Sequence, residues 1–122
     1  MIGLGNNVHV FAKPHRREAM RHLFEDLLQC GPAVTSEHPG MVEPMLIVRF
    51  PQGGSLSIEF TPDASDSEEP RLATWLELRA LEPNRAIDAL RSARIREVKH
   101  PGHPYYFMAP GGLVFTIVSA TP

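Results

Sequence analysis

The chain has 122 residues, of which 43% are hydrophobic and 21% charged, and its formal net charge at pH 7 is -2. This is the size and composition of one globular domain with a core of its own. The charge argues against a nucleic-acid partner, because such proteins usually carry a strong basic surplus. No apolar run is long enough to cross a bilayer, so no membrane partner is expected. The single cysteine, Cys30, excludes an internal disulfide and favours a reducing, cytoplasmic location.

The first half of the chain has the pattern of a strand, a helix and three further strands. Residues 7–13 alternate between small aliphatic side chains and polar or aromatic ones, which is typical of a strand. Apolar residues recur every three or four positions over residues 16–30, which predicts an amphipathic helix ended by Gly31-Pro32. The three further strands are expected at 33–36, 45–50 and 55–60.

Residues 61–71, TPDASDSEEPR, are acidic and carry no large apolar side chain, so they are predicted to be an exposed linker. The order of elements then returns. Its strands are expected at 73–81, 97–99, 105–109 and 113–119, and its helix at 84–93. The two hairpins even share a Gly-Gly turn, in PQGGSLSIEF and APGGLVFTIV. Two copies of one unit are the simplest interpretation.

The repeat predicts a single α+β domain over residues 1–122. It would consist of two βαβββ half-repeats, about 5–60 and 72–119, joined by the linker. Their strands would form a cupped mixed sheet with the helices on its outer face.

Alternation along the strands assigns side chains to the two faces of the sheet. The small or aliphatic residues expected under the helices are Val8, Val10, Ala12, Leu76, Leu78 and Ala80. The residues expected on the concave face are Asn7, His9, Phe11, Ser57, Glu59, Trp75, Glu77, Arg79, Leu113, Phe115 and Ile117. Mixed aromatic and polar side chains suit a small-molecule pocket. The expected ligand-binding residues are Phe11, Ser57, Trp75, Glu77, Arg79 and Phe115, although Trp75 and Phe115 could equally be core filling.

His9 and Glu59 are the candidate catalytic residues. A carboxylate that faces inward needs a partner, and His9 is expected on the same face, with Arg49 and Arg79 as the alternative partners. A His9–Glu59 contact could create a general base near neutral pH. The pair could equally be an inert hydrogen bond in the pocket wall.

Three other features have plain structural explanations. His100 and His103 have ligand-like spacing but stand in a loop with prolines and glycine, so a turn is expected. Arg16 and Arg17 are balanced by nearby acidic residues and are expected on a solvated helix face. Cys30 is expected at a helix C-terminus, where the dipole disfavours a thiolate, so it is not a candidate nucleophile.

The paired βαβββ units, His9 in the first strand and the Pro-Gly-Gly turn before the last strand resemble the vicinal oxygen chelate superfamily. This superfamily includes glyoxalase I, the bleomycin- and fosfomycin-resistance proteins and the extradiol dioxygenases. The resemblance covers about residues 8–118. It implies up to four metal ligands on the concave face, and His9 and Glu59 match two of those positions. Trp75 and Phe115 stand at the other two, with Thr116 as the alternative if the register slips by one residue.

Two ligands of four do not hold a divalent ion well, because catalytic sites normally keep three protein ligands. No cofactor is therefore expected, although a divalent metal is possible, with His9, Glu59 and Glu77 as its ligands. The leading hypothesis is a glyoxalase/bleomycin-resistance-like protein that binds a small organic molecule with an incomplete metal site. The alternatives are a metal-dependent lyase, isomerase or dioxygenase that uses those three residues, and an accessory module that senses a metabolite. The resemblance also implies a homodimer.

Overall fold

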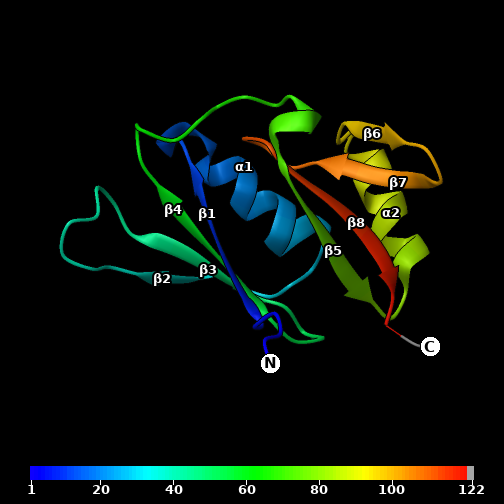
Figure 1. Ribbon diagram of the computed structural model, residues 1–122, viewed down its shortest axis with the longest axis horizontal. Helices are drawn as coiled ribbons and strands as arrows, with labels where there is room; N and C mark the ends of the chain where they lie inside the picture. The colour runs from blue at the N-terminus through cyan, green and yellow to red at the C-terminus, as the bar shows by residue number, and fades with distance from the viewer. Residues whose placement is uncertain (121–122) are drawn as a thin grey trace.

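The computed structural model describes residues 1–120, apart from the side chains of His103 and Pro104. In the first half, the strands are β1 (Asn7–Ala12), β2 (Val34–Ser36), β3 (Met45–Arg49) and β4 (Ser55–Phe60). The helix of this half, labelled α1 in Figure 1, consists of η1 (Pro14–Arg16), α1 (Arg17–Arg21) and the π-helical η2 (His22–Leu27). No described helix is long and apolar enough to span a membrane.

The second half repeats this order after the linker. Its elements are η3 (Pro70–Leu72), β5 (Thr74–Ala80), α2 (Pro83–Ser92), β6 (Glu97–His100), β7 (His103–Met108) and β8 (Leu113–Ser119). The predicted α+β class and the paired βαβββ order are confirmed. The expected turn at His100 and His103 is the short connection between β6 and β7, and the side chain of His103 lies outside the described residues.

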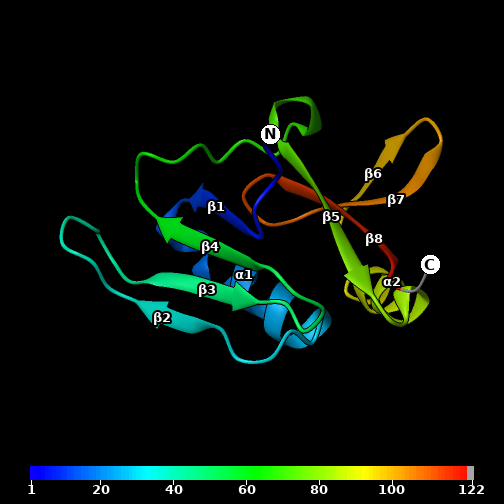
Figure 2. The same ribbon diagram turned by 60° about the horizontal axis from the view of Figure 1, so that its bottom comes forward.

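The strands form two mixed sheets rather than one continuous sheet (Figures 1 and 2). The first sheet has the order β1-β4-β3-β2 and the second has the order β5-β8-β7-β6. In each sheet the first strand pairs in parallel with the last strand of its unit, and the other pairs are antiparallel. The strands β1 and β5 therefore occupy equivalent sheet edges, as expected for a repeat.

One core joins both halves. The helices supply Met20, Leu23, Phe24, Ile87 and Leu90 to it. The side chains predicted to lie under the helices, Val8, Val10, Ala12, Leu76, Leu78 and Ala80, belong to this core or pack against it. The alternation along β1 and β5 is therefore confirmed, because each of these edge strands turns one face to the core and the other away from it.

The placement predicted for the last strand is wrong by one residue. Phe115 is 1% exposed and belongs to the core, with its ring centroid 5.9 Å from that of Phe107. It pairs in register with Leu76, while Val114 pairs with Trp75 on the opposite face. Leu113 and Ile117 follow Phe115 into the core. Because β8 is an inner strand with apolar residues on both faces, alternation carries no signal there.

The first helix also ends earlier than predicted. Gln29 adopts a left-handed conformation with φ of 52°, and the amide of Cys30 donates to the carbonyl of Phe24 at 2.9 Å. This hydrogen bond satisfies one of the last carbonyls of the helix. The helix therefore ends before the Gly31-Pro32 pair, which the sequence predicted as its end.

The linker and the arginine pair differ most from their predictions. Ala64 is buried, and Asp66 and Glu68 form ion pairs with Arg16, so the linker is more than an exposed connection. Arg17 forms an ion pair with Glu43, and its guanidinium lies over the ring of Phe60. Neither arginine simply faces solvent, because both join segments that are far apart in the sequence.

Candidate functional site

His9 and Glu59 lie on neighbouring strands, β1 and β4, on the face of the first sheet that points away from its helix. The Nε2 atom of His9 is 3.0 Å from Oε1 of Glu59, so the predicted contact between the two side chains is present. The two side chains are 44% and 25% exposed. A contact this open contributes little to stability, and a small molecule can reach it.

The ring of Phe11 completes this surface. Its centroid is 5.1 Å from that of His9, and the Phe11 side chain is 56% exposed. In the parallel pairing, Phe11 stands opposite Glu59 and His9 stands opposite the half-buried Ser57. The structure therefore brings together four of the residues predicted for the site.

A cavity of about 300 Å³ borders His9 and Phe11. Its walls come from β1 with α1, the linker with the start of β5, and the turn between β7 and β8. The lining residues are His9, Val10, Phe11, Ala12, Met20, Ser65, Ser67, Leu72, Ala73, Thr74, Pro110, Gly111, Gly112 and Leu113. A wider hollow continues past Phe11 towards Glu59 and the linker. The cavity has the volume of a site for a small ligand.

The remaining predicted residues lie elsewhere. Trp75 packs with Val98, Met108 and Val114 in a second apolar cluster, and its Nε1–H donates to the carbonyl of Pro70 at 2.7 Å. Glu77 and Arg79 are exposed farther along β5. These three belong to the second sheet and do not line the cavity. Phe115 is in the core, so its predicted place in a ligand pocket is corrected.

The donor set does not fit a divalent metal ion. Within the part of the chain that the structure describes, no three His, Cys, Asp or Glu side chains lie together as metal ligands. The set of His9, Glu59 and Glu77 is thus not assembled. Thr116, the alternative to Phe115, pairs with Glu77 in the register of β5 and β8. Its hydroxyl donates to the carbonyl of Tyr105 at 2.8 Å. Two ligands do not make a catalytic metal site.

Cys30 is half-buried near the end of the first helix. Burial raises the pKa of its thiol to about 11, because a thiolate would lose solvation. The thiol is therefore protonated near neutral pH, in agreement with the expectation that it is not a nucleophile.

Sequence reasoning missed the walls that the linker and the glycine turn contribute. A Cβ atom on Gly112 would collide with the carbonyl oxygen of Ser67, so glycine is required where the two segments meet. The available signal was the Gly-Gly pair itself, together with the acidic residues of the linker. Neither signal says which distant segment fills the space.

No family model and no curated protein matches the sequence. Solved structures do share its fold. A glyoxalase/dioxygenase from Nostoc punctiforme is 17% identical with a TM-score of 0.69, over 93% of this chain and 88% of that one. A glyoxalase/bleomycin resistance protein from Albidiferax ferrireducens T118 is 16% identical with a TM-score of 0.64, over 96% and 98%. Lactoylglutathione lyase from Agrobacterium tumefaciens is 12% identical with a TM-score of 0.64, over 98% and 96%.

These identities are low, so the likeness establishes the fold and not the activity. The chain has the paired βαβββ fold of glyoxalases, bleomycin-resistance proteins and related dioxygenases. The fold that the predicted resemblance implies is therefore confirmed.

Proposed function

We propose that this chain binds a small, partly apolar organic molecule in the cavity beside the His9–Glu59 pair, without a complete metal site. The observation that supports this most is the mixed character of the cavity walls. Phe11 and Leu72 are 56% and 78% exposed at its border, although apolar side chains gain by being covered. Serine, threonine and histidine side chains supply the few polar contacts that orient a ligand.

Phe11 would supply most of the affinity. Covering roughly 100 Å² of its ring is worth about 2.5 kcal/mol at 25 cal/mol per Å². His9 would supply orientation. When its Nε2–H donates to Glu59, Nδ1 carries a lone pair that can accept a ligand hydroxyl or amine proton.

A screen of neutral aromatic and heteroaromatic compounds by ligand-observed NMR tests this proposal. Binders should lose about tenfold or more in affinity with Phe11→Ala and less with His9→Gln. Val34→Ala is the matched control, because Val34 is an exposed apolar residue of the same sheet that does not line the cavity. Binders that respond equally to all three variants, or to none, would place the ligand elsewhere.

The same pair supports a second candidate, a reaction that begins with proton abstraction. The 3.0 Å contact holds the imidazole as a base, and its carboxylate partner stabilises the imidazolium that forms. An acidic C–H bond of the ligand would break, its electron pair would stay on the ligand, and its proton would move to Nδ1 of His9. In D2O, a bound carbonyl compound should exchange that hydrogen for deuterium with the wild-type protein and not with His9→Gln. Exchange at equal rates with both proteins would exclude His9 as the base.

We also propose that the chain forms a homodimer. Val34 is exposed on the open face of the first sheet, away from the cavity, and β2 and β6 are edge strands of their sheets. A second copy could cover these groups. Light scattering after size exclusion should give twice the 13.6 kDa mass of one chain. A monomer at tens of micromolar would contradict this proposal.

A further inference from the structure

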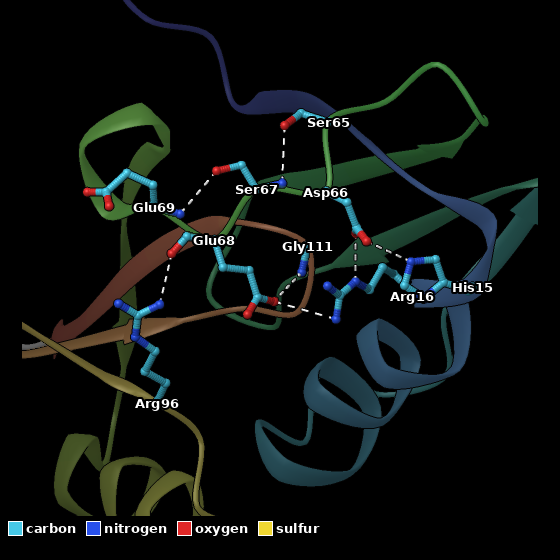
Figure 3. Close-up of polar contacts among 9 residues, drawn as sticks. All are labelled: His15, Arg16, Ser65, Asp66, Ser67, Glu68, Glu69, Arg96 and Gly111. Carbon is cyan, nitrogen blue, oxygen red and sulfur yellow. Dashed lines mark hydrogen bonds and ion pairs between the residues drawn. The ribbon is translucent and has the colours of Figure 1, made fainter.

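A bracket of four groups holds the linker against both halves of the chain (Figure 3). It consists of Arg16, Asp66, Glu68 and the backbone N–H of Gly111. Arg16 Nε donates to Asp66 Oδ1 at 2.8 Å, and Nη1 of Arg16 lies 3.5 Å from Glu68 Oε2. Gly111 N–H donates to the same oxygen of Glu68 at 3.0 Å. His15 adds a second partner for Asp66, with Nε2 at 2.8 Å from Oδ2.

The bracket joins the three segments that form the cavity walls. Arg16 ends η1, directly after β1, while Gly111 belongs to the turn between β7 and β8. Asp66 and Glu68 alternate along the linker with Ser65 and Ser67, which line the cavity. Arg16 itself is not among the lining residues. A shift of its guanidinium would therefore move two walls of the cavity without removing any group that a ligand touches.

The charges of the bracket reinforce one another. The hydrogen bond to Arg16, and then the one to His15, lowers the pKa of Asp66, and the bond to Asp66 raises the pKa of Arg16. All three side chains in the bracket are only partly exposed. Water therefore screens these contacts less than it screens a fully exposed ion pair. A planar guanidinium can serve two carboxylates at once, which a lysine ammonium does less well.

We propose that Arg16 is a positioning residue that fixes the linker and the glycine turn as walls of the cavity. That these walls select the ligand rests on the proposed function, whereas the placement of the linker does not. Arg16 acts through Asp66 and Glu68, and its loss releases residues 65–69 from the first half of the chain.

Two signals report this release without any ligand. Trp75 is the only tryptophan, and its indole N–H donates to the carbonyl of Pro70 at the end of the linker. Arg71, the next residue, has a side chain that is 92% exposed and offers a trypsin site. A linker that leaves its place should expose the indole to water and open the backbone to the protease.

The experiment makes two measurements on the folded wild-type protein and its variants. One is the rate of trypsin cleavage after Arg71, followed by mass spectrometry, and the other is acrylamide quenching of Trp75 fluorescence. Arg16→Gln should raise cleavage after Arg71 on the order of five- to tenfold and increase quenching. Arg16→Lys should give an intermediate result. The matched control is Arg85→Gln, which removes an exposed ion pair with Glu82 on α2 and should behave as wild type.

An Arg16→Gln protein with wild-type cleavage and quenching would overturn the proposal. If Arg16→Gln does not fold, the Asp66→Asn/Glu68→Gln double variant removes the partner charges of the same ion pairs without altering the helix. It should show the same increases, and wild-type values would again overturn the proposal. Failure to find an organic ligand would count against the proposed function alone, because neither readout uses one.

Discussion

Replacing Phe115 by alanine should destabilise the protein far more than replacing Phe11. Phe115 is 1% exposed and packs in the core beside Phe107, whereas Phe11 is 56% exposed on an open sheet face. Removing a fully buried phenylalanine costs about 3–5 kcal/mol. A chain of this size has about 6–18 kcal/mol of stability in total, so Phe115→Ala loses a large share of it. Phe11→Ala should cost less than about 1 kcal/mol.

The assay is urea unfolding followed by far-UV circular dichroism, with Trp75 fluorescence as a second probe. Equal slopes for wild type and variants would show that the change lies in stability and not in the extent of unfolding. A Phe115→Ala protein within about 1 kcal/mol of wild type would refute the register of β8.

Four further predictions concern titratable and ligating groups. Because burial raises the pKa of Cys30 to about 11, iodoacetamide at pH 8 should alkylate the native thiol about a hundredfold more slowly than the urea-unfolded one. Stability from the buried thiol is present below its unfolded pKa and should fall as pH rises towards 11. The lowered pKa of Asp66 means that its bond to Arg16 stabilises the fold above about pH 4 and is lost in acid, and Asp66→Asn should remove this part of the acid transition. Elemental analysis after dialysis against Ni, Zn, Mn or Fe should find well below one bound ion per chain. About one bound ion per chain, lost in His9→Ala and in Glu59→Ala, would contradict the claim that the metal site is incomplete.

The fold could be predicted from the sequence where one face of a strand meets the core and the other does not. In β1 and β5 this contrast fixes the register, so Val10 and Leu76 point towards their helices as expected. In β8 the neighbouring residues Val114 and Phe115 are both buried, on opposite faces. No alternation marks such a strand, and Phe115 was therefore placed on the wrong face.

The site could be predicted only in its strand-borne part. His9 and Glu59 meet because equivalent faces of paired strands carry them. The wall around Ser67 depends on ion pairs between Arg16 and carboxylates about 50 residues away. The local composition indicates an acidic, polar segment but not its distant partner, which is why the linker was expected to be exposed. Such contacts arise from tertiary packing and leave no periodic pattern in the sequence.

The most direct test of the central claim is calorimetric titration of the tightest organic binder from the screen, in EDTA and again with added Mn²⁺, Ni²⁺ or Zn²⁺. A ligand held by Phe11, His9 and the linker wall should bind with the same Kd under all these conditions, and Phe11→Ala should weaken it about tenfold throughout. Binding that occurs only with a divalent ion, and that is lost with His9→Ala, would contradict the claim and favour a metal-dependent enzyme.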